Sequence, residues 1–527
     1  MADFSNRSFH GRNLNDSKDS MFKDRRQITD EEAWLALDFA VEQVGGNLPL
    51  YTDRCQNHSS VNGIYPACEN VQWTCGFWPG EIWLAWEHTC CGRKSGHNDS
   101  EAGRTAAEKS PAEHCAGHKG SSQEYRGAER LGDEGGSADS EQAQAAVHAE
   151  KFRAAAMKLV ESFEHRIEKK IEVDHHDMGF LYTPSCVAAW KLTGDERAKN
   201  AAILAADQLM TRFQKKGEFF QAWGKLGEPG TYRYIIDCLM NLPLLYWASE
   251  TTGDPRYQEA ARRHITTCMR YSFRADGSTY HTFFMNQDGT PSHGETCQGY
   301  KDDSFWARGQ AWGVYGSVLS YRYDPKPEYL DIFHRALDFY LSRLPEDLVP
   351  YWDMVFSDGS GEPRDSSSAA IVVCGLLEAR RYLPEEEAQK CEVLARQMLY
   401  SLTKNYTVWG GQCLPETDGD KNGNESDAKP GKEPGNDSEG KSGGEHCEKS
   451  AEKAAVADEC EYAAETGQKQ KKITLIPGAG LLLHGTYSKK SPYNTCTEEG
   501  VDEYTSWGDY FYMEALTRLT RDWKSYW

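Results

Sequence analysis

The sequence predicts an all-α protein, an (α/α)6 barrel built from six helical hairpins, and three observations lead to that fold. Apolar segments of helical length recur along the chain, and several end in the same short Thr-Gly-Asp turn. Each turn is followed by a segment whose apolar residues recur with helical spacing on one face. Residues able to carry out chemistry stand just before the apolar segments, where they can meet at one end of a stack of repeats.

The hairpins are clearest in the middle of the chain. Residues 187–195 and 245–254 are apolar runs that end in Thr-Gly-Asp, and Pro255 begins an amphipathic segment that continues to Tyr271. Glycine suits the position after a helix, and aspartate suits the N-cap of the next helix. With weaker copies included, apolar helices are expected to end near Glu87, Leu192, Glu250, Tyr321, Arg381 and Leu519.

A row of helical hairpins can form an open solenoid or close into a ring, and the positions of the motifs favour the ring. Chemically rich segments occupy residues 74–80, 175–180, 232–241, 302–312 and 365–370, each at the start of an apolar helix. Only a closed ring brings all of these segments to one site. The sequence therefore predicts the barrel.

Two segments differ sharply from the rest of the chain. Residues from about 93 to 147 and from about 416 to 471 are rich in small, polar and charged residues and nearly lack large apolar ones. Such a composition cannot bury enough surface to offset chain entropy, so both are expected to be disordered insertions. We expect a polar extension at 1–28 and one barrel domain at 29–527. Both insertions should hang from the end opposite the motifs, because the first replaces a Thr-Gly-Asp turn.

Composition excludes several classes of function. The formal net charge of −22 argues against a nucleic-acid partner, because phosphate binding needs clustered Lys and Arg. No run is long enough to span a membrane, and residues 1–20 lack the apolar core of a secretory signal. The 16 cysteines follow no disulfide framework, and no CxxC or HExxH metal motif occurs. We expect a soluble, cytoplasmic monomer that binds neither membranes nor nucleic acid.

Asp177 and Asp237 are the strongest candidates for catalytic groups. Asp177 follows a pair of histidines, and Asp237 stands between Ile-Ile and a long apolar run. The alternative for both is an N-cap, a common role for aspartate at a helix start that is worth about 1 kcal/mol. The apolar surroundings of Asp237 predict burial, which raises the pKa of a carboxyl group and suits it to proton transfer. His176 could form a hydrogen bond to the substrate or to a carboxylate. The alternative is a plain capping or surface histidine.

Residues 306–312, Trp-Ala-Arg-Gly-Gln-Ala-Trp, form the most unusual string. Arg308 lies between two aromatic residues and could clamp a carboxylate or a phosphate, with Trp312 as a stacking face for a sugar ring. The alternative is a structural ion pair between Arg308 and Asp302 or Asp303.

Other polar and aromatic residues stand at equivalent points of the repeat. Trp78 lies in Gly-Phe-Trp-Pro-Gly, where a tight turn before the helix would expose it as a platform. His281 and Gln298 add hydrogen-bonding groups, and Ser506 opens the last apolar helix, which could close the ring. The recurrence of such residues at one point of successive repeats indicates a shared site.

Together these strings resemble one enzyme family. GFWPG, HHDMGF, IIDCLMNLPLL, ARGQAW and SWGDYFYMEAL are similar to motifs of the unsaturated glucuronyl hydrolases, glycoside hydrolase family 88. The resemblance covers almost the whole chain outside the two insertions. It implies an (α/α)6 barrel that acts on oligosaccharides left by polysaccharide lyases, which carry a 4,5-unsaturated uronic acid at the non-reducing end.

The resemblance also implies the chemistry. Enzymes of this kind hydrate the C4=C5 vinyl ether instead of attacking the anomeric carbon. Asp237 would be the general acid/base that protonates C4 and helps water add at C5, and Asp177 would be the second essential carboxylate. No metal or organic cofactor is implied. The residues expected in the substrate pocket are Arg308, Trp312, His176, His281, Gln298, Trp78, Trp223 and Ser506.

Three other functions stay open at this point. An unsaturated rhamnogalacturonyl hydrolase would share the barrel and the chemistry. A barrel similar to the N-acylglucosamine epimerases would need several catalytic histidines on facing helices. A sugar-binding module without activity would not need both Asp177 and Asp237.

Overall fold

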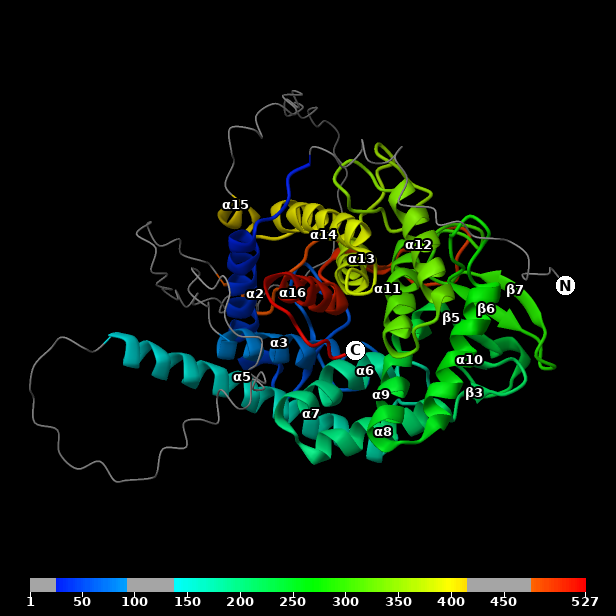
Figure 1. The fold of residues 1–527 in the computed structure, drawn as a ribbon, viewed down its shortest axis with the longest axis horizontal. Coiled ribbons are helices and arrows are strands. Elements are labelled where there is room, and N and C mark those ends of the chain that lie inside the picture. Colours follow the sequence, from blue (N-terminus) through cyan, green and yellow to red (C-terminus); the bar gives the residue numbers. More distant parts are fainter. Residues whose placement is uncertain (1–24, 92–136, 415–474) are drawn as a thin grey trace, which may run out of the picture.

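The computed structural model describes residues 25–91, 137–414 and 475–527, and within them six inner helical segments are surrounded by six outer helices (Figure 1). The outer helices are α2 (Asp30–Tyr51), α5 (Ser137–Glu168), α8 (Glu196–Met210), α10 (Pro255–Tyr271), α12 (Pro327–Ser342) and α14 (Glu385–Asn405). The inner segments are α3 (Phe77–Cys91), α6 (Met178–Tyr182) with η1 (Thr183–Val187) and α7 (Ala188–Thr193), η3 (Ile236–Met240) with α9 (Leu242–Thr252), α11 (Ala307–Tyr323), α13 (Ser366–Ala379) and α16 (Ser506–Thr520).

The inner segments close into a ring. Neighbours in chain order pack against one another from α3 through η1 and α9 to α11, α13 and α16. The ring is completed because α16 also packs against α3. The predicted (α/α)6 barrel is confirmed, and the open solenoid is excluded.

Burial explains why the two kinds of helix differ in sequence. Every residue of α13 is buried, because this helix is enclosed by other helices on all sides. In α10, buried residues such as Ala260, Ala261 and Ile265 share one face, and the opposite face is charged. An apolar surface all round is typical of an enclosed helix, and a single apolar stripe is typical of an outer one.

The predicted turns between inner and outer helices are present. Gly194 and Gly253 follow α7 and α9 with φ of 71° and 75°, in the left-handed region that glycine adopts without strain. The side chain of Asp195 accepts a hydrogen bond from the backbone N–H of Ala198 at 2.9 Å, and Asp254 accepts one from Arg256 at 2.9 Å. Both aspartates therefore cap the helices that follow.

Short strands, which the sequence did not predict, lie in the loops that connect outer to inner helices. The largest sheet pairs β5 (Arg233–Ile235), β6 (Thr282–Met285) and β7 (Pro291–Glu295) in antiparallel order. The two-stranded sheets are β1 (Cys55–Gln56) with β2 (Ala67–Cys68), β3 (Phe213–Gln214) with β4 (Phe219–Phe220), and β8 (Gly485–Ser488) with β9 (Glu499–Glu503). Two short turns, η2 (Pro229–Thr231) and α15 (Gly410–Cys413), complete the elements. We call this end of the barrel, where the inner helices begin, the rim.

The expected boundaries of the polar segments need three corrections. Helix α5 begins at Ser137, inside the first expected insertion, because its Ala, Gln and Glu residues are good helix formers. Ile28, expected in a polar extension, is buried, and its backbone N–H donates to Arg396 O at 3.2 Å. Residues 1–24, 92–136 and the whole second insertion lie outside the described residues.

The third correction concerns where the second insertion attaches. The residues that precede the second insertion follow the end of α14. The carbonyl oxygen of Tyr406, at the C-cap of α14, accepts a hydrogen bond from Leu483 N at 2.8 Å. His484 O in turn accepts one from Ser366 N at the start of inner helix α13. Both flanks therefore lie at the rim, and the expectation that this insertion hangs from the opposite end is wrong. Outer helices such as α14 run toward the rim, so a segment that follows α14 leaves the barrel at the rim.

In the part of the chain that the structure describes, no helix is both long and apolar enough to cross a lipid bilayer.

Candidate active site

Both candidate carboxylates lie at the rim, and neither acts as a helix cap. Asp177 occupies the N-cap position of α6, but its side chain makes no capping hydrogen bond. Asp237 lies within η3, and Asn241 holds the N-cap position of α9. The N-cap alternative is therefore wrong for both, so another reason must hold two carboxylates in an apolar barrel.

A glycine lets the two carboxylate-bearing loops touch. A Cβ atom at Gly179 would lie 2.4 Å from the Cα atom of Asn241, so no other residue fits there without moving the backbone. Across this contact the backbone N–H of Phe180 donates to Asn241 Oδ1 at 2.9 Å. The loop that carries Asp177 is thereby fixed against the loop that carries Asp237.

Asp177 is held in its ionised form. Its Oδ1 lies 3.3 Å from His176 Nε2 and its Oδ2 lies 3.2 Å from His175 Nδ1. Burial by itself would raise the pKa of Asp177, but the two histidines and a hydrogen bond from Asn241 outweigh it and hold the pKa below its ordinary value. Asp177 therefore brings a fixed negative charge to the site.

Asp237 has the opposite character. Burial first, and then the charge of Asp177, raise the pKa of Asp237 to about 7, although Arg308 and the Trp312 indole act in the other direction. Its Oδ1 is enclosed and has no hydrogen-bond partner among the described residues. The residue as a whole is half-buried, less than the sequence predicted, so a ligand can reach it. A carboxyl group with a pKa near neutrality is suited to give and take a proton.

Arg308 is not a free clamp for an anion. It is fully buried, and its two terminal nitrogens donate to Thr486 O, Tyr487 O, Gln298 Oε1 and, at 3.1 Å, Asp365 Oδ2. The ion-pair alternative is correct in kind, but the partner is Asp365 and neither Asp302 nor Asp303. The partner comes from the start of α13, which sequence spacing cannot reveal.

The two tryptophans expected as platforms are covered. Trp312 is fully buried, and Phe180 and Phe511 lie 5.2 and 5.5 Å from it between ring centroids. Trp78 is 1% exposed and donates from Nε1 to Tyr51 O at 3.2 Å. The expectation of exposed stacking faces is wrong for both. Helix α3 already begins at Phe77, so Trp78 lies inside the helix and not on a turn before it.

His176 and His281 are neutral near pH 7. Burial lowers the pKa of His176 to about 4 and that of His281 to about 3. His281 Nδ1 accepts a hydrogen bond from Cys297 N at 2.9 Å, which places its proton on Nε2. Gln298, whose Oε1 binds Arg308 at 3.1 Å, lies next to Cys297. His281 thus offers one N–H donor of fixed direction to a ligand.

Trp223 and Ser506, which are far apart in the sequence, are the last two residues expected in the substrate pocket. Trp223 is 38% exposed and stacks on His175 with ring centroids 4.3 Å apart and planes 7° apart. One face of this indole is therefore supported by the loop that carries Asp177. Ser506 is buried at the start of α16, and its Oγ has no partner in the described part of the protein.

Several residues of the site were not predicted. His175 and Asn241 hold Asp177, Asp365 holds Arg308, and Trp73 stacks on Trp507 at 5.4 Å. Asn241 carried a signal, because it is a lone amide in an apolar run. Asp365 and Trp73 carried none beyond their place before an inner helix.

No group of three or more His, Cys, Asp or Glu within the described ranges is placed to hold a metal ion.

Comparison with known proteins decides the family. Residues 141–407 match the model of Glycosyl Hydrolase Family 88. The chain belongs to glycosyl hydrolase family 88. It is 35% identical over 503 residues to an unsaturated chondroitin disaccharide hydrolase of Streptococcus pneumoniae, covering 95% of each chain. The family resemblance of the sequence motifs is confirmed.

Solved structures of family 88 enzymes have the same fold. An unsaturated glucuronyl hydrolase from Streptococcus agalactiae superposes with a TM-score of 0.70 at 34% identity, covering 98% of each chain. A variant of that enzyme, solved in complex with the disaccharide dGlcA-GalNAc6S, superposes with a TM-score of 0.64 at 32% identity, covering 96% of each chain. The present family 88 chain is a hydrolase of the unsaturated glucuronyl hydrolase group.

Proposed function

We propose that this enzyme removes the 4,5-unsaturated uronic acid from the non-reducing end of oligosaccharides made by polysaccharide lyases, with Asp237 as the proton donor. The observation that carries the proposal is the pairing of two unlike carboxyl groups. Asp177 is ionised, while the pKa of Asp237 is raised to about 7 beside it. Two titratable groups with pKa values pushed apart mark an acid and its supporting charge.

The proposed reaction is acid-catalysed hydration of a vinyl ether. The carboxyl proton of Asp237 is transferred to C4, and positive charge develops on C5 and the ring oxygen. Water adds at C5 while the Asp237 carboxylate takes one of its protons, which returns the acid to its starting form. The hemiketal at C5 then opens, and the hemiacetal left at C1 releases the remaining saccharide as an alcohol.

Asp177 supports this step through its charge. A buried carboxylate near the ring stabilises the positive charge that develops at C5, and it also raises the pKa of the acid. His175, His176 and Asn241 hold Asp177 and keep it ionised. We assign Asp177 a supporting role and not the proton transfer itself.

The other residues divide into ligand contacts and supports. We propose His281 Nε2–H as a donor to the uronic acid and the exposed face of Trp223 as a platform for the neighbouring sugar. Arg308 and Trp312 act on Asp237 from inside the barrel and lower its pKa toward neutrality. Without them the pKa of Asp237 would be higher still, and the carboxyl group would donate its proton to C4 less readily.

The direct test uses the ultraviolet absorbance of the unsaturated uronic acid. Purified protein is given unsaturated disaccharides from chondroitin, hyaluronan, heparin, gellan and xanthan, together with rhamnogalacturonan fragments. Absorbance should fall with at least one uronic-acid product as the double bond is hydrated. No loss with any of them would exclude the proposal, and loss with the rhamnogalacturonan fragment alone would favour the rhamnogalacturonyl alternative.

We also propose that the enzyme works in the cytoplasm as a monomer. Several of its cysteines, such as Cys186, Cys238 and Cys268, are buried as thiols, which suits a reducing compartment. Sedimentation of the purified protein and fractionation of cells that express it test the two parts. A dimer at micromolar concentration or a secreted product would contradict them.

A further inference from the structure

The three-stranded sheet on the rim carries an aromatic and basic row on one face. Arg233, Phe284 and His293 are direct cross-strand partners on β5, β6 and β7. The ring of His293 stacks on Phe284 with centroids 5.1 Å and planes 6° apart, and the Arg233 guanidinium lies 5.5 Å from the Phe284 centroid. Tyr234 and Phe283 point to the other face of the sheet and are buried. The row is therefore left on the face that the core does not use.

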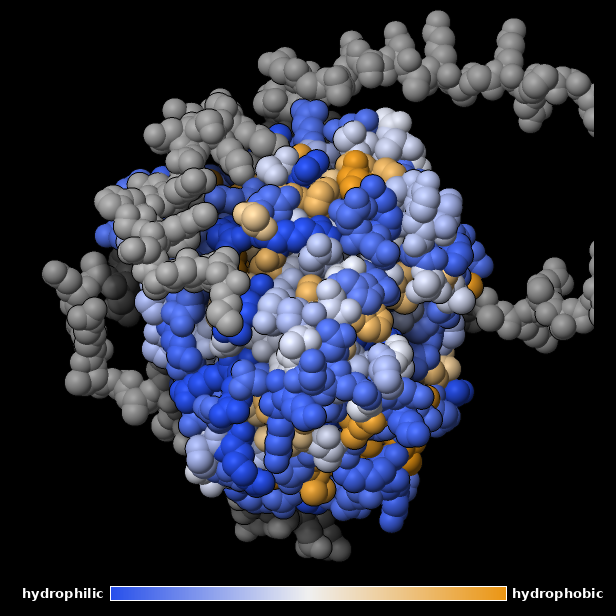
Figure 2. All heavy atoms as spheres, turned by 90° about the vertical axis from the view of Figure 1, so that its right-hand side faces the viewer, coloured by the Kyte–Doolittle hydropathy of each residue, from blue (hydrophilic) through white to orange (hydrophobic). Residues whose placement is uncertain are grey.

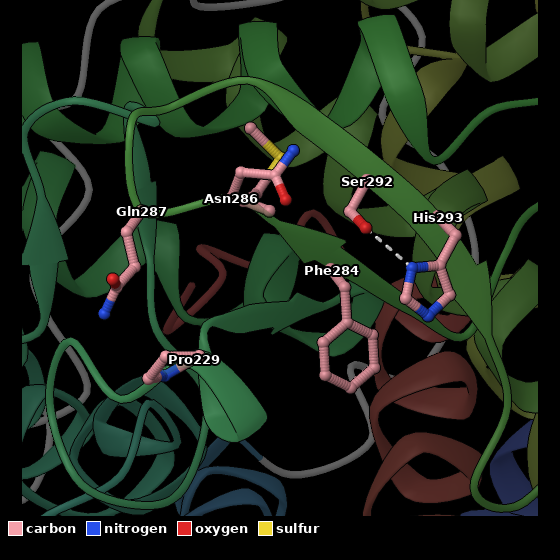
Figure 3. A pocket seen from close by; sticks show the side chains of 7 residues that line it. Pro229, Phe284, Asn286, Gln287, Ser292 and His293 are labelled. Carbon is pink, nitrogen blue, oxygen red and sulfur yellow. Dashed lines mark hydrogen bonds between the residues drawn. The ribbon is translucent and has the colours of Figure 1, made fainter.

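A hollow of about 280 Å³ opens beside this row (Figure 3). We call it the distal hollow, and its lining residues are Pro229, Phe284, Met285, Asn286, Gln287, Ser292 and His293. Figure 3 shows Phe284 and His293 on one side of it and Pro229 and Gln287 on the other. Apolar rings beside amide, hydroxyl and imidazole groups are the mixture that holds a sugar unit, which has both apolar faces and hydroxyl edges.

The guanidinium of Arg233 is half-buried and has no carboxylate or hydrogen-bond acceptor within bonding distance among the described residues. Nearby charges are already paired, because Glu295 binds His293 Nε2 at 2.7 Å. The chain carries a net charge of −22, so an unpaired arginine on its surface stands out. Its planar fork suits a carboxylate or a sulfate.

The row continues directly from the catalytic loops. Thr282 and Ile235 are partners on the same face of the sheet, and Phe284 lies two residues further, about 7 Å along the strand. Ala222 joins the two regions, since its N–H donates to Arg233 O and its carbonyl accepts from His176 N. The charge of Arg233 also contributes to lowering the pKa of both His176 and His281, which agrees with this closeness. Figure 2 is viewed from the side of the barrel that carries this sheet.

We propose that the distal hollow and Arg233 form a binding subsite for the reducing-side sugars of substrates longer than a disaccharide, and that Arg233 binds an acidic group on those sugars. This inference rests on the proposed function. A disaccharide would fill the space between Asp237 and Trp223, and a longer chain would continue over Phe284. The subsite adds affinity for the chain without touching the reacting atoms.

The test compares substrates of two lengths. The kcat/KM of an unsaturated chondroitin tetrasaccharide is divided by that of the unsaturated chondroitin disaccharide, for native protein and for Phe284→Ala. Loss of the aromatic wall should lower this ratio about tenfold, through KM. Leu204→Ala on α8, which also removes a partly exposed apolar side chain, is the control and should leave the ratio unchanged.

The charge on the ligand is tested with Arg233→Gln. The ratio should fall about threefold or more for the acidic chondroitin tetrasaccharide. It should be unchanged for an unsaturated tetrasaccharide whose other three units are neutral. Arg197→Gln, a surface arginine on α8, is the matched control. A desulfated chondroitin tetrasaccharide separates the two acidic groups, because a persisting effect assigns Arg233 to the carboxylate and a lost effect assigns it to the sulfate.

The outcomes separate this inference from the proposed function. If native protein hydrates no unsaturated disaccharide, the proposed function fails. If it does, but the native ratio is near one or neither variant changes it, the subsite is overturned and the function stands. Circular dichroism confirms that each variant is folded before its ratio is taken.

Discussion

Two buried clusters of polar groups, one at each end of the barrel, differ in how fully they are hydrogen-bonded. At the end opposite the rim, which we call the closed end, Arg518 donates to Glu514, Glu378, Tyr315 and Ser525. Trp527 Nε1 donates to the second oxygen of Glu514. At the rim, several enclosed atoms lack a hydrogen-bond partner in the described structure, namely Asp237 Oδ1, His176 Nδ1, Arg308 Nε and Ser506 Oγ. A buried polar atom without a partner costs free energy, so its presence marks a place shaped for a ligand.

The comparison teaches what kind of observation separates a structural charge from a catalytic one. Burial is similar, since Arg518 is 2% exposed and Arg308 is fully buried. The Arg518 cluster and the cluster around Asp237 differ in how many of their buried polar atoms have a hydrogen-bond partner. A fully bonded network holds the fold in place, and an incomplete one reserves hydrogen-bonding capacity for the substrate.

The largest expected effect is a loss of catalysis at the rim, with the fold unchanged. Asp237→Asn removes the transferable proton but keeps the size of the side chain, so kcat should fall by roughly a thousandfold or more. The loss of ultraviolet absorbance measures kcat, and circular dichroism checks the fold. Asp195→Asn is the control, because Asp195 caps α8 and pairs with the surface residue Arg197, away from the rim. It should retain kcat, and near-native activity of Asp237→Asn would refute the assignment of the acid.

The second largest effect is a loss of stability from a substitution at the closed end, with substrate binding unchanged. Arg518→Met leaves Glu514 buried without its counter-ion and leaves Glu378 with only Arg322 at 3.9 Å, which should lower the free energy of unfolding by about 3 to 5 kcal/mol. Denaturant unfolding measures the loss. KM of the folded fraction should not change, because these residues belong to the end away from the rim. A raised KM would show that the two ends are coupled.

The third prediction concerns the pH dependence of activity and stability that Asp237 should cause. The pKa of Asp237 is raised to about 7 in the folded protein, so the carboxyl loses its proton, and kcat/KM falls, as pH rises through about 7. A group with a raised folded pKa stabilises the fold at low pH and loses that contribution as pH rises. Native protein should therefore lose more thermal stability than Asp237→Asn between about pH 5 and about pH 8. Parallel melting curves for the two would contradict the raised pKa.

The smallest effect concerns the exposed face of the site. Trp223→Ala removes a platform that stacks on His175, and the loss of about 1 kcal/mol of binding should raise KM for the disaccharide roughly fivefold. The kcat value should change little, because Trp223 does not contact the carboxylates through any hydrogen bond. A fall in kcat with constant KM would place Trp223 in the chemical step instead.

The barrel and its carboxylates could be predicted because their signals are local. The Thr-Gly-Asp turns at Gly194 and Gly253 fix the hairpin repeat through backbone conformation and capping, which depend on neighbouring residues. Asp177 and Asp237 were found because a carboxylate in an apolar run is conspicuous. Their unlike pKa values depend on contacts between loops, and the sequence could not supply those.

Most of the wrong predictions concern properties that depend on partners far away in the sequence. Exposure of Trp78 and Trp312 is decided by neighbours such as Tyr51, Phe180 and Phe511. The ion pair of Arg308 with Asp365 spans a difference of 57 positions. The start of α5 at Ser137 has a different cause, because the low apolar content of this segment predicts disorder although its Ala, Gln and Glu residues favour a helix.

Closure of the ring by α16 against α3 has a consequence for the order in which the molecule is made. These two helices lie near opposite ends of the described chain, so the seam between them is a contact of very large sequence separation. During synthesis the apolar flank of α3 stays uncovered until α16 has emerged, and such long-range contacts form slowly. The enzyme therefore acquires its site, to which Ser506 of α16 contributes, as the last event of its own assembly.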